Sequence, residues 1–169
     1  MTRDDGIKRH LNVVADLTPL LCSLDEAFER KSWHGPNLLG TLRRVSAETA
    51  AWRPAAGRHN IWEIALHTAY WKYAVRRRLT GEKRGSFALK GSNWFRRDGG
   101  DQKAWKADVK LLVDEHRKLR EVVARLKPAD LRKTSQRSRY GHDFAIRGIA
   151  AHDLYHAGQI QLLKRLRAR

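Results

Sequence analysis

Apolar residues recur at the spacing of an α-helix in four long segments, and this periodicity limits the possible folds more than any other feature of the sequence. The segments surround Pro19, run from Asn60 to Gly81, and cover about residues 101–127 and 143–167. The third carries one apolar stripe made of Trp105, Val109, Leu112, His116, Leu119, Val123 and Leu126. No segment alternates apolar and polar residues over the length of a strand. The sequence therefore predicts an all-α protein folded as a four-helix bundle.

Residues at the ends of the second segment are typical of helix boundaries. Asn60 is an expected N-cap, and Glu63 is its expected reciprocal partner in a variant of the capping box. Gly81 is a typical residue to follow a helix C-terminus. Residues 37–52 are predicted to form short additional helical turns. The glycine-rich segment 81–100 contains three aromatic residues, and it is either a lid or binding loop or a surface loop held down by its aromatics.

The chain length suits a single domain. We expect one domain over residues 1–169, of which 1–17 form a flexible N-terminal segment. The single cysteine, Cys22, excludes an intramolecular disulfide. No signal peptide is evident, and no apolar run approaches the ~20 residues that span a bilayer. We therefore expect a cytoplasmic protein that does not associate with membranes.

The chain is strongly basic, with 35 Lys and Arg residues against 18 Asp and Glu and a formal net charge of +17. Such a balance is common among nucleic-acid-binding proteins. However, the basic residues are spread over every segment, and no helix-turn-helix, RNA-recognition or zinc-finger pattern accompanies them. We therefore expect a diffuse basic surface that binds nucleic acid only weakly and without sequence preference.

Three of the 8 histidines have the positions of metal ligands. His152 and His156 are four residues apart, so a helix places both imidazoles on one face. His67 lies on the apolar stripe of the second segment, and facing helices of a bundle can bring it opposite this pair. Each histidine alone is explained as a hydrogen-bonded core residue, but three buried imidazoles without a shared partner would be costly. His116, on another apolar stripe, is the rival ligand.

The segment HDLYH is not the HExxH motif of zinc metalloproteases. That motif needs a glutamate after the first histidine as general base, and the shorter Asp153 stands here. Only 13 residues follow His156, and they contain no further ligand. The sequence therefore argues against a protease.

Three stretches of the chain resemble the DinB-like, or YfiT-like, metalloprotein superfamily. They are WHGPNLLGTLRRVSAETAAWRP, HNIWEIALHTAYWKYAVRRRLTGE and GIAAHDLYHAGQIQLLKRL, and the resemblance extends from about residue 18 to 167. It implies a four-helix bundle with a metal ion held by His67, His152 and His156. It also implies a reaction that uses a low-molecular-weight thiol such as mycothiol or bacillithiol. The high positive charge departs from what we expect of this family.

A metal with three protein ligands keeps open positions, which is typical of a catalytic site. We expect a divalent cation, zinc or nickel, with iron, manganese or cobalt as alternatives. The leading hypothesis is a metal-dependent enzyme, either a thiol S-transferase or a hydrolase of a small substrate, with a thiol and a substrate as partners and a homodimer as a candidate assembly. The alternative is a non-catalytic, metal-stabilised binding protein that associates with nucleic acid. Candidate site residues besides the three histidines are Glu63 and Asp153 for catalysis and Arg76, Trp94 and Gln159 for cofactor binding.

Overall fold

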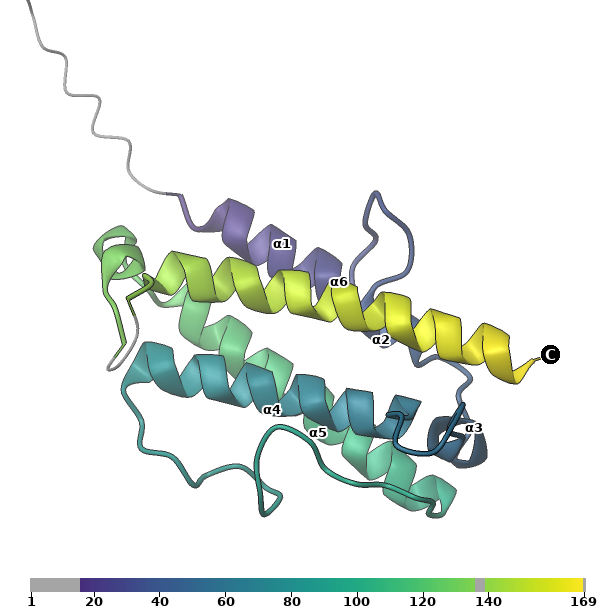
Figure 1. Ribbon diagram of the computed structural model, residues 1–169. Helices are drawn as coiled ribbons and strands as arrows, with labels where there is room; N and C mark the ends of the chain where they lie inside the picture. Colours follow the sequence, from purple (N-terminus) through teal and green to yellow (C-terminus); the bar gives the residue numbers. More distant parts are fainter. Residues whose placement is uncertain (1–15, 136–138, 169) are drawn as a thin grey trace, which may run out of the picture.

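The computed structural model describes residues 16–135 and 139–168, and all of its regular elements are helices (Figure 1). They are α1 (Thr18–Phe28), α2 (Leu38–Thr41), α3 (Ala47–Ala51), α4 (Ile61–Thr80), α5 (Gln102–Ala124), the 3-10 helix η1 (Pro128–Arg132) and α6 (His142–Arg167). The predicted all-α fold is confirmed, and α2 and α3 are the short turns expected within residues 37–52. The expected flexible segment 1–17 lies outside the described residues, except for its last two.

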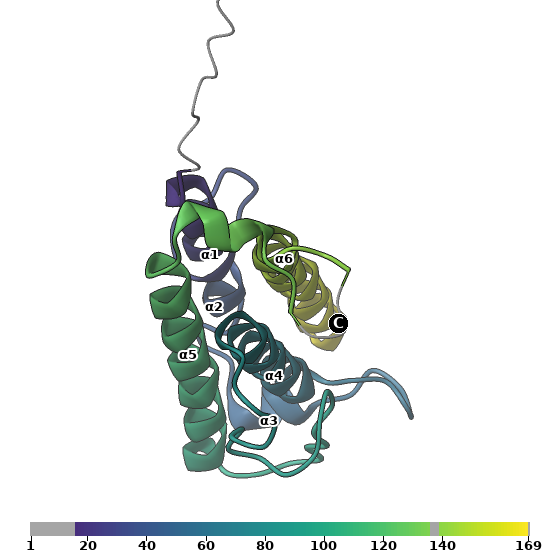
Figure 2. The same cartoon turned by 90° about the vertical axis from the view of Figure 1, so that its left-hand side faces the viewer.

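The four longer helices form a bundle in which each packs against two others (Figure 2). Helix α4 packs against α5 and α6, and α1 packs against the same two helices, so that α1 and α4 both lie between α5 and α6. Helix α2 packs against α1 and α6, whereas α3 packs against α4 and α5. In the described part of the chain, no helix is long and apolar enough to cross a membrane. The side-by-side packing of α4 and α6 positions the candidate site.

The ends of α4 are defined by side-chain and backbone chemistry. The buried Asn60 accepts a hydrogen bond from the Glu63 backbone N–H at 2.9 Å, as an N-cap should. Gly81 ends the helix in the left-handed conformation, with φ of 76°. The reciprocal half of the predicted capping box is wrong, because the Glu63 carboxylate accepts from Arg53, His59 and the Arg97 backbone instead. Glu63 therefore links the loops that contain Arg53 and Arg97 to the start of α4.

The apolar core consists of two clusters, and buried polar and charged side chains lie between them. On α4 the first cluster ends at Ala69 and the second begins at Val75, with the fully buried Lys72 between them. His116 on α5 and Asp153 on α6 are buried at the corresponding breaks in their helices. Lys72 Nζ and Asp153 Oδ2 form an ion pair whose two side chains have no exposed surface. The bundle therefore contains an ion pair at the point where its two apolar clusters meet.

Residues 81–100 follow α4 back along its length before α5 begins (Figure 1). This segment has no regular helix or strand. Phe87 and Phe95 pack against each other and against Tyr70, with ring centroids 5.3–5.8 Å apart. Trp94, next to the buried Phe95, reaches the candidate site instead. The aromatic side chains therefore hold the segment against α4, as one of the two expectations states, and Trp94 contacts the candidate site, whereas a role as a lid or binding loop stays a prediction.

Candidate metal centre

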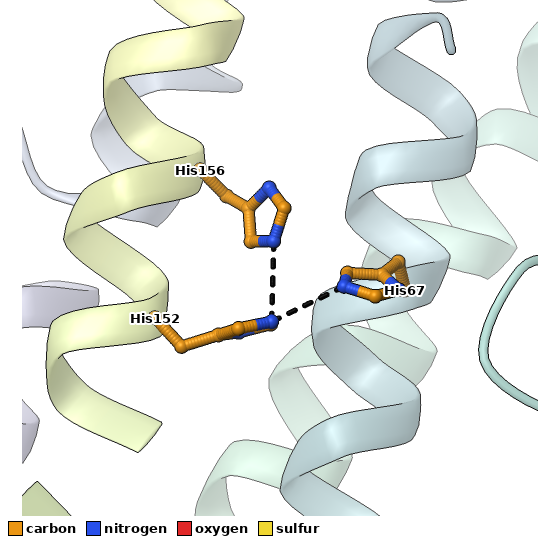
Figure 3. A group of neighbouring side chains, drawn as sticks. All are labelled: His67, His152 and His156. Carbon is orange, nitrogen blue, oxygen red and sulfur yellow. Dashed lines mark hydrogen bonds between the residues drawn. The ribbon is translucent and has the colours of Figure 1, made fainter. Parts of the chain in front are cut away.

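Three histidines from two helices converge at the centre of the α4–α6 contact (Figure 3). His67 projects from α4, and His152 and His156 project from successive turns of α6. The Nε2 atom of His152 lies 3.1 Å from the Nε2 atoms of both His67 and His156. Nitrogen ligands of one tetrahedral zinc ion lie roughly 3.3 Å apart, because the Zn–N distance is about 2.0–2.1 Å. The two 3.1 Å distances therefore fit nitrogens that share a metal ion, and all three ligand atoms lie within 4.8 Å of one another.

The hydrogen bonds on the far side of two rings determine which nitrogen carries the proton. His67 Nδ1 donates to the Asn93 carbonyl oxygen at 3.0 Å, and His156 Nδ1 donates to Gln159 Oε1 at 2.7 Å. With Nδ1 protonated, the Nε2 atoms of both neutral rings present lone pairs. His152 Nε2 faces both lone pairs, and a single N–H there can satisfy only one of them. A cation between the three rings would satisfy all of them, so the donor set fits a metal.

The three imidazoles favour the neutral form that binds metals. Burial, together with smaller repulsion from His156 and His59, lowers the pKa of His67 to about 4, against the opposing effect of the hydrogen bond to the Asn93 carbonyl. Burial lowers the pKa of His152 to about 3, with added repulsion from His156 and His67. Burial also lowers the pKa of His156. All three rings are therefore neutral at pH 7, so a metal ion would need no net proton loss from them, and His152 would only have to carry its single proton on Nδ1.

Asn93 and Trp94, from the loop 81–100, fix the orientation of His67. Asn93 has a left-handed backbone with φ of 67°, a conformation that asparagine tolerates better than most residues. Its carbonyl accepts from His67, while its side-chain Oδ1 accepts from Trp71 Nε1 at 2.9 Å. The Trp94 ring stacks on His67, with centroids 3.8 Å apart and planes 12° apart. Trp94 was predicted as a site residue from the sequence, whereas Asn93 was not, because its only sequence signal is an asparagine within a glycine-rich loop.

Glu63 anchors the loops beside the site and does not contact His67. Its buried carboxylate accepts two hydrogen bonds from Arg53, at 3.0 and 2.7 Å, and one from the Arg97 backbone at 3.1 Å. It also lies 2.9 Å from His59 Nδ1, and the His59 ring stacks on Trp94 with centroids 3.6 Å apart. Glu63 therefore supports the site through His59 and Trp94. His59 was not among the site residues predicted from the sequence.

Glu63→Gln is expected to reduce the loss of stability in acid. Burial alone would raise the pKa of Glu63, but hydrogen bonds from Arg53, His59 and Arg97 lower it from 4.5 to about 2. A depressed carboxyl pKa stabilises the fold above the unfolded value, and the contribution is lost as the pH falls from 4.5 towards 2. It amounts to about 3 kcal/mol at most. Urea unfolding at pH 6 and pH 3 should show a smaller decrease for the variant, and equal decreases would contradict the prediction.

The other expected site residues occupy different places. Gln159 lies beside the triad, as expected, through its contact with His156. Asp153, although next to His152 in the sequence, is directed to Lys72 in the bundle core. Arg76 does not reach the triad, because its guanidinium is hydrogen-bonded to Glu82 at 2.8–2.9 Å. The structure therefore brings Trp94 and Gln159 to the three histidines and leaves Arg76 and Asp153 elsewhere.

His116, the rival ligand, is buried away from the triad. Its ring stacks on Phe28, with centroids 3.8 Å apart, and neither ring nitrogen has a hydrogen-bond partner among the described residues. Burial lowers the pKa of His116 to about 2, with smaller contributions from Lys72 and Arg120. It is therefore a neutral core histidine, and among the described residues the possible metal-binding group comprises only His67, His152 and His156.

A cavity of about 920 Å³ opens onto the triad. All three histidines line it, together with Trp71, Asn93 and Trp94 on one side and residues of α6 on the other. Such a volume is within the range of small-molecule sites. A metal ion at the triad would therefore be reachable by a small ligand.

Comparison with known proteins gives one family. The model of the DinB superfamily matches residues 30–160, which include the whole triad. No curated protein and no solved structure matches the chain.

Proposed function

Because the chain belongs to the DinB superfamily, we propose that it is a metal-dependent enzyme that acts with a low-molecular-weight thiol. One observation carries the proposal. His67, His152 and His156 direct their Nε2 atoms to a common point, and that point lies at the wall of a cavity large enough for a small molecule. A purely structural metal would not need such access, whereas a catalytic one does.

The donor set favours zinc, nickel or another borderline cation. The triad offers three neutral nitrogen atoms, and neither a carboxylate nor a thiolate belongs to it among the described residues. Calcium and magnesium prefer oxygen ligands, whereas imidazole suits the later transition metals. Three nitrogen ligands leave at least one coordination position for an exogenous ligand.

The residues around the triad divide the remaining tasks. Asn93 and Gln159 hold the protonated Nδ1 atoms of His67 and His156, so both rings keep their Nε2 lone pairs directed to the centre. Trp94 stacks on His67 and lines the cavity, which restricts ring motion and water access on that side. A bound divalent cation would supply Lewis acidity, which favours the nucleophilic thiolate form of a coordinated thiol. We infer a thiol S-transfer reaction on this basis.

Titration of the Co²⁺-substituted protein with 2-mercaptoethanol tests the proposal. A sulfur ligand should add a charge-transfer absorption in the near ultraviolet that saturates with thiol concentration. Binding should also release a proton, because the thiol enters as thiolate. Ethylene glycol, the matched alcohol, should produce no such band. His116→Ala should retain the full response, because His116 lies outside the triad.

Two results would contradict this function. Protein that binds no cobalt would exclude the metal centre itself. Cobalt-loaded protein whose visible spectrum is normal but does not respond to thiol would exclude the thiol reaction. The second result would favour the alternative in which the site activates water to hydrolyse a small substrate.

A further inference from the structure

The cavity above the triad is lined mainly by apolar side chains. On the α6 side these are Tyr155, Leu162, Leu163 and Leu166, and Ile64 of α4 and Pro54 of the preceding loop lie opposite. Two of the polar lining residues, Asn93 and Gln159, are hydrogen-bonded to histidines of the triad. The cavity therefore has polar groups at the triad, and most of its other lining side chains are apolar.

Three of these α6 side chains are exposed to an unusual extent for large apolar residues. Tyr155 is 64% exposed, Leu162 58% and Leu166 42%. Positions 155, 162 and 166 lie on one face of the helix, since their spacings of seven and four residues are close to whole turns. Other apolar residues of α6, such as Ile160, are fully buried in the bundle. An apolar face that borders a cavity is typical of a ligand-binding surface.

The charges that surround the cavity further restrict the kind of ligand that it can bind. Arg58 is the only permanently charged side chain among the described residues that line the cavity, and no carboxylate lines it. The chain as a whole carries a formal net charge of +17. A cationic ligand would be repelled by this field and would find no counter-charge in the cavity.

We propose that the cavity binds a predominantly apolar, neutral or anionic small molecule, with its polar head group at the triad and its apolar part against Leu162 and Leu166. The head-group contact rests on the proposed function, whereas the apolar contact does not require a metal. This molecule would be the second substrate of the proposed reaction, in which the thiolate sulfur forms a bond to an electrophilic carbon of the head group while a leaving group departs from that carbon with the bonding electrons and takes up the proton that the thiol released. A thiol conjugated to sugars would place its hydroxyl groups against Leu162 and Leu166, where they would find no hydrogen-bond partners. The thiol and the second substrate are therefore expected to occupy different parts of the cavity.

A homologous series of alkyl hydroxamates tests the proposal. Hydroxamates bind divalent metals through two oxygen atoms, and the series from acetohydroxamate to octanohydroxamate varies only the apolar chain. In zinc-loaded protein we expect affinity, measured by calorimetry, to rise about threefold to fourfold per methylene group. A terminal ammonium group on the hexano chain should abolish the gain. A constant affinity across the series would overturn the proposal.

Matched variants locate the binding surface. The double variant Leu162→Gln/Leu166→Gln should remove most of the dependence on chain length without unfolding the protein, because both side chains are already exposed. Phe144→Gln is the control, since Phe144 is a 51% exposed apolar residue of the same helix that does not line this cavity. An unchanged chain-length dependence in the double variant, or an equal loss in the control, would contradict the assignment.

Two further measurements distinguish a failure of this proposal from a failure of the proposed metal centre. Metal content and acetohydroxamate affinity report the metal centre, and both should be unaffected by the double variant. If the protein binds no metal, alkyl carboxylates in metal-free protein still report the chain-length dependence, so the two proposals can fail independently. The molar mass in solution tests whether a second copy of the chain covers this face instead. A dimer that the double variant dissociates, with no chain-length dependence, would overturn the small-molecule assignment.

Discussion

Asp153→Ala is expected to lower the free energy of unfolding by about 3–5 kcal/mol, the largest effect on stability that we predict for a single substitution. The Asp153 carboxylate pairs with Lys72 Nζ, and neither side chain has exposed surface. Burial lowers the pKa of Lys72 and raises that of Asp153 to about 6, whereas the charge of each partner opposes these shifts. Removing the carboxylate leaves a buried ammonium group without a counter-charge. Urea unfolding at pH 7 measures the loss.

The double variant Lys72→Met/Asp153→Leu should be far more stable than Asp153→Ala alone. It replaces both charges with apolar side chains, and such exchanges of buried ion pairs are often neutral or stabilising. Lys72 Nζ also lies 4.7 Å from the centre of the Phe28 ring, and a methionine can keep a favourable contact there. Metal content should be unchanged, because Asp153 is directed away from the triad. A double variant as unstable as the single one would show that the destabilisation does not arise from the unpaired charge.

The helices were predictable because their signals are local. The apolar periodicity, the N-cap Asn60 and the terminal Gly81 depend only on residues within the same segment. The convergence of His67 with His152 and His156 was predictable for a related reason. All three positions face inward on helices long enough to be neighbours in a bundle, so few arrangements keep them apart.

The contacts of individual polar side chains were not predictable, because their partners come from distant segments. Glu63 was expected to cap α4, but Arg53 and the Arg97 backbone reach its carboxylate from two loops. Asp153 was considered for its proximity to His152 in sequence, yet consecutive residues of a helix point in different directions, and Asp153 pairs with Lys72 in the bundle core. Asn93 contributes a backbone carbonyl, and no property of its side chain reveals that role. Such contacts depend on loop conformations, which local patterns do not determine.

Alanine at any one of His67, His152 and His156 is expected to lower the affinity for Zn²⁺ by a factor of at least ~100. Loss of a group that merely supports a metal ligand typically costs 10–100-fold, and loss of a ligand itself should cost more. Pairs of histidines occur by chance on many protein surfaces, so the two imidazoles that remain should give little selectivity among metal ions. Competition with a chromophoric chelator measures the affinity. Purified wild-type protein should contain roughly one metal ion per chain, and the variants much less.

His116→Ala provides the control that separates loss of a ligand from loss of a buried histidine. His116 is buried like His67 and His156 and its pKa is lowered by the same cause, but it stacks on Phe28 outside the metal-binding group. This variant should lose some stability, because it leaves a cavity in the core, and should keep its zinc affinity. Full zinc occupancy in a His67→Ala/His152→Ala double variant would refute the metal centre. Loss of zinc in His116→Ala, with the fold intact, would instead show that the third ligand is His116, supplied by a different arrangement of α5.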